Sequence, residues 1–268
     1  MHLQTALCSR RPRIGLLGGT FDPPHRGHLA LAAHFSSQLQ LDQLIFIPSG
    51  QSWQKHTVRS SEHRLAMTTL LAADLAEISP SQTNITVSDI EVTRDGPSYT
   101  IDTLRALRTH FGNEASLCWL MGIDQLHQLH TWHQWQRLSD YTHLCVATRP
   151  EHGTLVNENN ATSLSNCPSV PIASFSPPLC TQSPEKKTTT ENARPHVPGN
   201  WVAGTVAEVQ STTHGFLLLD TQLAINLSST VLRTLLAKPQ IDLHAFNAWL
   251  TPSVLQYIYQ HHLYLPSD

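Results

Sequence analysis

Short apolar runs, separated by longer amphipathic stretches, mark the first half of this chain. Residues 14–17, 44–47, 117–121 and 144–147 are almost continuously apolar, which is typical of strands buried on both faces of a sheet. Residues 85–92 alternate between polar and apolar side chains instead. That alternation predicts a strand with one face buried and the other exposed.

Helical spacing of apolar residues fills the intervals between these runs. It predicts helices over about 23–39, over 62–75 and ending near residue 110, and a short helix that begins at Trp132 with Thr131 as its cap. Strands that alternate with helices predict an α/β fold, with a parallel sheet and helices on both of its faces. Ligands of such sheets bind beyond the carboxyl ends of the strands, near the point where the strand order reverses.

The pattern breaks between residues 151 and about 200, which are rich in Ser, Thr, Asn and Pro. This stretch predicts a low-complexity insertion, because it cannot bury enough apolar surface to offset the entropy of ordering it. Residues 1–12 predict a disordered extension. Apolar periodicity returns with a strand at 216–219 and helices from about residue 228. We therefore expect residues 13–268 to form a single domain that the insertion interrupts.

Composition narrows the classes of partner. Of the 268 residues, 14% are charged and 40% are hydrophobic, and the net charge is −3. A nucleic-acid surface would need clustered basic residues, which this chain lacks, so we expect no nucleic-acid partner. No apolar run approaches the length of a membrane span, so we expect no membrane partner either. The sequence leaves the oligomeric state open.

Cysteine usage points to a reducing compartment. The chain has five cysteines, an odd number, and no C-x-x-C pair. Cys118 and Cys145 fall inside apolar runs, which predicts buried thiols. The first residues carry arginines but no continuous apolar stretch after them, so we expect no signal peptide. A cytoplasmic protein is the expectation.

The candidate chemistry begins directly after the first apolar run, where Gly18 and Gly19 precede a predicted helix. Asp22 is a good N-cap, and Pro23 suits the first helical position. The first turn of a helix offers free N–H groups and a positive dipole end to an anion, and glycines let the backbone approach it. The spacing matches neither the Rossmann G-x-G-x-x-G motif nor a P-loop.

His25 and His28 are three residues apart, so on a helix they share a face. Together with the glycines they predict a phosphate site with two imidazole donors at its rim. Glycines after a strand are also ordinary turn residues, and histidines on helices usually pack or face solvent. The convergence of all these features within eleven residues favours the phosphate site.

A second candidate anion site lies at Ser228-Ser229-Thr230, where another helix is predicted to begin. Hydroxyl residues at a helix start satisfy backbone N–H groups, which alone would explain two of the three. Arg233 lies three residues after Thr230, on the face of the first turn. A guanidinium beside a helix N-terminus suits a triphosphate.

Residues 18–28, GGTFDPPHRGH, resemble the Gly-Gly-Thr-Phe-Asp-Pro-x-His-x-Gly-His motif of bacterial nicotinate-nucleotide adenylyltransferases, members of the HxGH nucleotidyltransferase superfamily. Residues 228–233 are similar to the family's Ser-Ser/Ala-Thr-x-x-Arg motif. The resemblance implies a Rossmann-like nucleotidyltransferase fold. It gives catalytic roles to His25, His28 and Arg233. The residues that it implies for ATP binding are Gly18, Gly19, Thr20, Phe21, His25, His28, Gly122, Asp124, Ser229, Thr230 and Arg233.

Further segments resemble the family's site for the second nucleotide. Residues 97–100, PSYT, resemble the segment whose backbone recognises the pyridine carboxylate, and Thr131-Trp132 resembles the pair whose tryptophan stacks on that ring. Taken alone, Trp132 would more simply be a core anchor. Arg149 begins a match to the family's Arg-Pro-Gly in which Glu151 replaces the glycine. The residues implied for nicotinate mononucleotide binding are Gly19, Thr20, Lys55, Ser98, Tyr99, Thr100, Trp132 and Arg149.

The predicted reaction joins ATP and nicotinate mononucleotide to give deamido-NAD and pyrophosphate, with Mg²⁺ accompanying ATP. The attacking phosphate oxygen is ionised at neutral pH, so no general base is needed. One alternative is adenylyl transfer to another phosphate, such as nicotinamide mononucleotide or phosphopantetheine. A second alternative is a nucleotide-binding module without catalytic activity. The protonation states of the two histidines stay open.

Overall fold

A computed structural model describes residues 10–50, 59–79, 82–148, 200–223, 227–238 and 246–264. By its internal contacts the chain divides into one unit of residues 1–153 and 197–268 and another of 154–196. All described residues belong to the first unit. The predicted insertion up to residue 199 and the predicted extension up to residue 9 lie outside the described residues.

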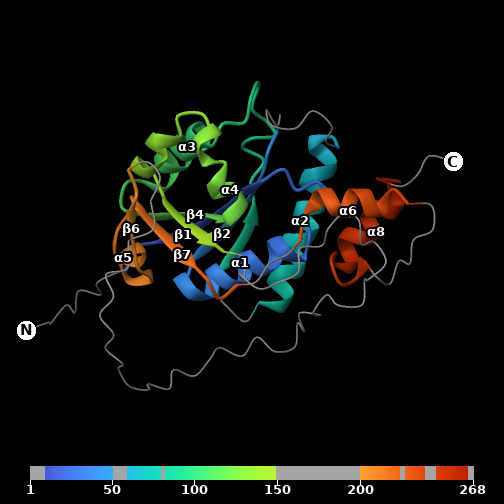
Figure 1. Ribbon diagram of the computed structural model, residues 1–268, viewed down its shortest axis with the longest axis horizontal. Coiled ribbons are helices and arrows are strands. Elements are labelled where there is room, and N and C mark those ends of the chain that lie inside the picture. The colour runs from blue at the N-terminus through green and yellow to red at the C-terminus, as the bar shows by residue number, and fades with distance from the viewer. Residues whose placement is uncertain are drawn as a thin grey trace, which may run out of the picture. The chain divides into compact units, whose positions relative to one another are not determined.

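The described residues form a seven-stranded sheet in the order β3-β2-β1-β4-β5-β7-β6 (Figure 1). Every neighbouring pair is parallel, which confirms the predicted sheet. The strands are β1 (Arg13–Gly19), β2 (Gln43–Pro48), β3 (Asn84–Val87), β4 (Ser116–Gly122), β5 (His143–Ala147), β6 (Val202–Ala203) and β7 (Phe216–Asp220).

Helices connect the strands, as the alternating pattern predicts. Two short 3₁₀ helices, η1 and η2, lie between β4 and β5. The helices are α1 (Arg26–Leu39), α2 (Ser61–Ile78), α3 (Thr100–Phe111), α4 (Ile123–His127), η1 (Leu129–Thr131), η2 (Trp135–Asp140), α5 (Val206–Ser211), α6 (Ser229–Leu236) and α8 (Pro252–Gln260).

Successive residues of the central strands pack alternately into two separate apolar cores, one on each face of the sheet. Leu17 and Phe46 pack with α1 and α2 on one face of the sheet. Leu16 and Ile45 pack with α3 and η2 on the other face. In Figure 1, α3 accordingly lies on the opposite side of the strands from α1. Burial on both faces explains why these strands are apolar at nearly every position.

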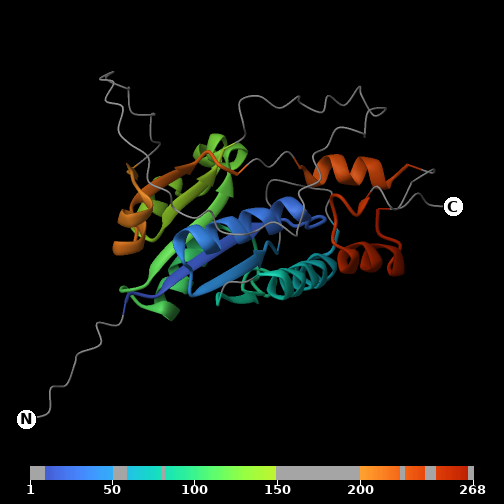
Figure 2. The same cartoon turned by 90° about the horizontal axis from the view of Figure 1, so that it is seen from below.

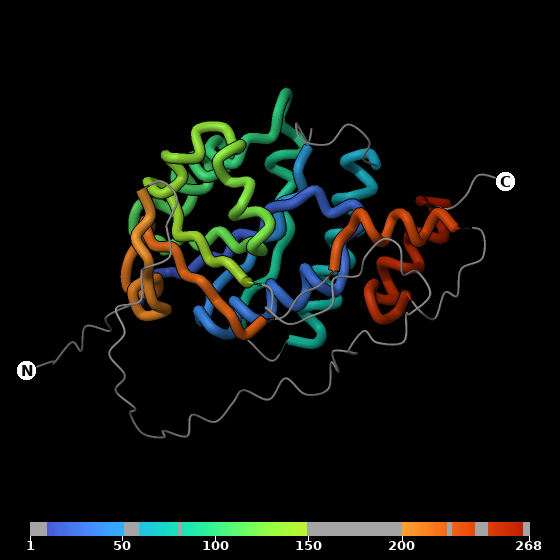
Figure 3. The backbone as a smooth tube through the Cα atoms, in the orientation of Figure 1, coloured from blue at the N-terminus to red at the C-terminus, as the bar shows by residue number. Residues whose placement is uncertain are grey.

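The strand order reverses at β1, which lies between β2 and β4. Leu16 of β1 pairs in register with Ile45 on one side and with Trp119 on the other. Figure 3 shows the path of β1 between those two strands. The chain therefore leaves β1 at the point where open α/β sheets bind ligands.

The last described helices lie beyond the N-terminal end of α1. Figure 2 shows α6 and α8 side by side there. The contacts agree, because the Arg26 N–H donates to the Trp249 carbonyl over 2.7 Å and the Ser229 hydroxyl donates to the Pro23 carbonyl over 3.0 Å. A segment from the end of the chain thus reaches the loop that follows β1.

The predicted start of the first helix at Pro23 is wrong. α1 begins at Arg26, and His25 is its N-cap instead of Asp22. Pro24 disfavours helical backbone at the residue before it, which keeps Pro23 out of the helix. Asp22 is buried, and its carboxylate accepts a hydrogen bond from Tyr264 instead of capping the helix.

Two other predictions need correction. The strand expected over 85–92 ends at Val87, after which Thr93 N–H bonds to the Asp89 carbonyl in a turn. No helix begins at Trp132, whose backbone is extended (φ −76°, ψ 142°). Thr131 does not cap forward, since its hydroxyl donates back to the Gln128 carbonyl over 2.7 Å.

Two smaller predictions concern the thiols and the membrane. Cys118 and Cys145 are free and buried, as expected. Burial raises the pKa of the Cys145 thiol well above its usual value, so the thiol stays protonated. Within the part of the chain that the structure describes, no helix is long and apolar enough to span a membrane.

Candidate active site

A cavity of about 540 Å³ opens at the carboxyl ends of β1, β2, β4 and β5. Its volume lies in the range of small-molecule sites. Of the predicted site residues that are described, all except Arg233 line it. They are Gly18, Gly19, Thr20, Phe21, His25, His28, Ser98, Tyr99, Thr100, Gly122, Asp124, Trp132, Ser229 and Thr230. Lys55 and Arg149 lie outside the described residues.

The two histidine rings stack in the first turn of α1. Their centroids are 3.8 Å apart with an angle of 27° between the planes. The backbone N–H of His25 donates to Nδ1 of His28 over 3.2 Å. When the His28 ring is neutral, its proton therefore sits on Nε2. Each ring thus has a fixed place on the cavity wall.

His25 is held neutral by its surroundings. It is only 4% exposed, and burial lowers its pKa well below 6.5, with a further contribution from the charge of His28. Its Nδ1 atom is buried. A neutral imidazole offers one N–H donor, which suits a phosphate oxygen.

Position 18 requires glycine for packing as well as for the close approach of an anion. A Cβ atom at Gly18 would lie 2.3 Å from the ring of Trp119. The next bend is made by Phe21, whose φ of +51° is left-handed. Its buried ring packs edge-on against Phe46 and His28, at centroid distances of 6.1 and 4.9 Å. Such a conformation costs a non-glycine residue about 1–3 kcal/mol, which this packing offsets.

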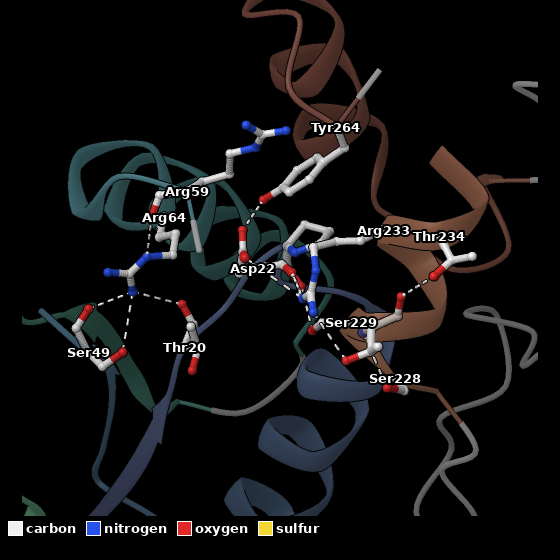
Figure 4. A network of polar contacts seen from close by, with 12 residues as sticks. Thr20, Asp22, Ser49, Arg59, Arg64, Ser228, Ser229, Arg233, Thr234 and Tyr264 are labelled. Carbon is white, nitrogen blue, oxygen red and sulfur yellow. Dashed lines mark hydrogen bonds and ion pairs between the residues drawn. The ribbon is translucent and has the colours of Figure 1, made fainter. Parts of the chain in front are cut away.

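The start of α6 lies against the loop after β1, so the two predicted anion sites are neighbours. The Ser228 hydroxyl caps the helix by accepting the Thr230 N–H over 3.3 Å. Arg233 donates from Nη1 to the Asp22 carbonyl over 2.6 Å and from Nη2 to the Thr230 hydroxyl over 3.2 Å. Figure 4 shows Arg233 between Asp22 and the first turn of α6.

The predicted site for the second nucleotide gathers at the start of α3. Ser98 is buried, and its hydroxyl accepts the Gly50 N–H over 2.9 Å. Tyr99, the N-cap of α3, stacks on His133 with centroids 4.4 Å apart. Trp132 packs edge-on against Trp119 at 6.3 Å. Trp132 therefore packs on the core and also lines the cavity, and its stacking on a pyridine ring stays a prediction.

The sequence did not single out Glu91, which is 5% exposed and lines the cavity. The Thr103 hydroxyl donates to its carboxylate over 2.7 Å. Burial raises the pKa of Glu91. Its backbone carbonyl lies 2.0 Å from where a Cβ of Gly50 would be, so Gly50 must be glycine. Glu91 falls within the half-exposed strand that the sequence predicted over 85–92, where a charged residue gives no sign of burial.

The sequence also gave no sign of Arg64, a guanidinium that is 1% exposed. Its Nη1 donates to the carbonyls of Thr20 and Ser49 over 2.9 and 2.5 Å (Figure 4). Its Nη2 donates to the Gly50 carbonyl over 2.7 Å. Arg64 therefore joins the loop after β1 to the loop after β2. Ser49, which lines the cavity, could have been found, because it directly follows the second buried strand.

Comparison with known proteins gives consistent results. A family model described as cytidylyltransferase-like matches residues 16–235. A relative from Herminiimonas arsenicoxydans, named "Probable nicotinate-nucleotide adenylyltransferase", is 34% identical over 252 residues, which cover 94% of this chain and 96% of the relative. A relative of the same name from Clavibacter sepedonicus is 43% identical over 149 residues, covering 55% of this chain and 70% of the relative.

Solved structures agree on the fold. Nicotinic acid mononucleotide adenylyltransferase from Plasmodium falciparum, complexed with NaAD, superimposes with a TM-score of 0.59 at 15% identity, covering 95% of this chain and 98% of that one. At that identity the match supports the fold alone. The fold, the family model and a relative similar along nearly its whole length together show that this chain belongs to the nicotinate-nucleotide adenylyltransferase family, within the cytidylyltransferase-like proteins.

Proposed function

We propose that this protein transfers the adenylyl group of ATP to nicotinate mononucleotide, giving deamido-NAD and pyrophosphate. One observation carries the proposal: a single cavity joins the stacked His25–His28 pair and the start of α6 to the start of α3 and Trp132. Two neighbouring sites are what a reaction between two nucleotides requires. The names of the relatives support the same activity.

The histidine end of the cavity suits the transferred phosphate. The acceptor's phosphate oxygen attacks the α-phosphorus in line, the bond to the β-phosphate oxygen breaks, and pyrophosphate leaves. Negative charge grows on the oxygens around the α-phosphorus, where His25 and Nε2 of His28 can donate hydrogen bonds. The N-terminus of α6 and Arg233 attract the leaving phosphates.

The other end suits a pyridine carboxylate. Backbone N–H groups at the start of α3 point out of the helix, where Tyr99 and Thr100 line the cavity. A carboxylate accepts hydrogen bonds from such groups, whereas the amide of nicotinamide also brings an N–H₂ that needs an acceptor. The indole of Trp132 offers a stacking surface for the ring.

Magnesium is proposed to enter with ATP. Mg²⁺ keeps several waters and binds mainly through substrate phosphates, so it needs few protein ligands. Within the described ranges, no three His, Cys, Asp or Glu side chains form a metal-binding group, while Asp124 offers one carboxylate on the cavity wall. The ion belongs with the substrate, where it neutralises phosphate charge.

The test is pyrophosphate release from Mg–ATP with three acceptors: nicotinate mononucleotide, nicotinamide mononucleotide and phosphopantetheine. We expect the highest kcat/KM with nicotinate mononucleotide. Preference for phosphopantetheine would reject the acceptor assignment. An absence of turnover with all three acceptors would instead support a nucleotide-binding module without catalytic activity.

A further inference from the structure

Asp22, inside the loop after β1, carries a buried carboxylate between two possible partners. The side chain is 1% exposed. Its Oδ1 accepts a hydrogen bond of 2.5 Å from the hydroxyl of Tyr264, which follows α8. Its Oδ2 has no hydrogen bond among the described residues and lies 3.8 Å from Nη1 of Arg233. Figure 4 shows Asp22 between Tyr264 and Arg233.

Arg233 is bound to the backbone of Asp22 more closely than to its side chain. The same Nη1 donates to the Asp22 carbonyl over 2.6 Å, shorter than its 3.8 Å distance to the carboxylate. The carbonyl holds the guanidinium without neutralising it, and the carboxylate pairs with it only over 3.8 Å, whereas a hydrogen-bonded carboxylate pair would offset more of its charge. The Arg233 side chain is 25% exposed, so it can meet a charged ligand.

We propose that Tyr264 is a positioning residue for adenylyl transfer: its hydroxyl satisfies the Asp22 carboxylate and so leaves the charge of Arg233 available to the triphosphate of ATP. The inference rests on the proposed role of Arg233 in binding ATP. Tyr264 itself does not line the cavity, and it acts through Asp22.

The surroundings of Tyr264 keep its hydroxyl a donor. Burial and the Asp22 carboxylate raise the pKa of Tyr264, so the phenol keeps its proton at every physiological pH. The guanidinium of Arg59 lies 5.0 Å from the centre of the ring and holds its other side. The ring is only 5% exposed, which limits alternative positions for the hydroxyl.

Removal of the hydroxyl should turn the carboxylate toward Arg233. A buried carboxylate without a donor is costly, and Nη1 of Arg233 already lies 3.8 Å from Oδ2. The Arg64 guanidinium, by contrast, is engaged by the carbonyls of Thr20, Ser49 and Gly50. In Tyr264→Phe we expect the Kd of a non-hydrolysable ATP analogue, measured by calorimetry without acceptor, to rise about five- to tenfold. The KM for ATP should rise in parallel and the KM for nicotinate mononucleotide should stay within about twofold.

Tyr259→Phe is the matched control. It removes a hydroxyl from α8 that has no hydrogen-bond partner among the described residues, so nucleotide affinity should not change. The decisive variant combines Tyr264→Phe with Asp22→Asn. A neutral amide cannot neutralise Arg233, so the double variant should bind the analogue at least about threefold more tightly than Tyr264→Phe alone.

Three results would overturn the proposal. They are unchanged analogue affinity in Tyr264→Phe, an equal loss in Tyr259→Phe, and a double variant that binds no better than Tyr264→Phe. A merely structural role for Tyr264 would not give the rescue. Because calorimetry needs no acceptor, these results also stay separate from any failure of nicotinate mononucleotide as the substrate.

Discussion

His25 and His28 share one turn of helix but are held differently. His25 is buried and kept neutral, while His28 accepts the His25 N–H at Nδ1 and so presents Nε2. Ring stacking at 3.8 Å fixes both rings before substrate arrives. Preorganised donors of this kind act on charge that develops in the transition state, and they contribute less to binding of the ground state.

His28→Ala should therefore lower kcat about 10²–10³-fold while the KM for ATP changes by less than about threefold. Steady-state pyrophosphate release measures both constants. His130→Ala is a suitable control, because His130 is exposed and does not line the cavity. A His28→Ala protein with near-normal kcat, or with a loss confined to KM, would contradict a transition-state role.

The site residues that the sequence predicted belong to local motifs, whereas those that it missed have hydrogen-bond partners farther away in the chain. Gly18, His25 and His28 lie within one local motif, whose spacing alone brings them together. Arg64 and Glu91 are buried charges whose hydrogen-bond partners lie on other elements: the loop after β1 for Arg64 and helix α3 for Glu91. A charged residue on a helix or a loop is normally exposed, so no local pattern distinguishes these two from surface residues.

At the scale of elements, α2 does more than cover the sheet. Through Arg64 it binds the carbonyls of the loops after β1 and β2, which form one wall of the cavity. A planar guanidinium can serve several carbonyls at once, whereas the single ammonium of lysine cannot match that geometry. These hydrogen bonds between the two loops thus require arginine at position 64.

Arg64→Lys should lower the free energy of unfolding by about 2–4 kcal/mol, because several buried carbonyls lose their donor. Urea unfolding followed by tryptophan fluorescence measures the change. Arg137→Lys, at an exposed pair with Asp140, should change stability by less than about 0.5 kcal/mol. Equal effects in the two variants would show that the buried hydrogen bonds of Arg64 add nothing to stability.

Long periodic elements were predictable and short ones were not. α1, α2 and α3 and the buried strands appear near their predicted places because burial on defined faces leaves a pattern in the sequence. α5 has six residues and one buried side chain, Val209, which is too little for a pattern. The strand predicted to Val92 ends at Val87, and the polar and apolar alternation beyond it belongs to a turn.

At the scale of the whole molecule, segments from distant parts of the chain pack against the loop after β1, which lines the cavity. Ser229 bonds to Pro23 across 206 positions, and Tyr264 bonds to Asp22 across 242. The fold class and the two motifs could be predicted separately from the sequence, since each is local. Their contact, and the part of Tyr264 in it, depends on the tertiary packing of α6 and α8 beyond α1 (Figure 2).

Whole-molecule stability should depend on pH through a histidine far from the proposed chemistry. His143 of β5 is fully buried, its Nδ1 accepts the Phe216 N–H over 3.2 Å, and burial lowers its pKa to about 4. Above about pH 6.5 the ring is neutral in both the folded and the unfolded chain, so its ionisation does not change the free energy of unfolding. As the pH falls from 6.5 towards 4, the unfolded chain takes up the proton first, which favours unfolding.

The shift corresponds to a loss on the order of 3 kcal/mol between pH 7 and pH 4. In His143→Asn, an amide oxygen can take the place of Nδ1 without titrating. Whatever its free energy of unfolding at pH 7, that of the variant should fall by about 2–3 kcal/mol less than the wild type's on acidification. Urea unfolding at pH 7.0, 5.5 and 4.5 measures both curves. Parallel curves would mean that protonation of His143 does not drive the acid loss, and that His25, whose pKa is lowered for the same reason, is the group to test instead.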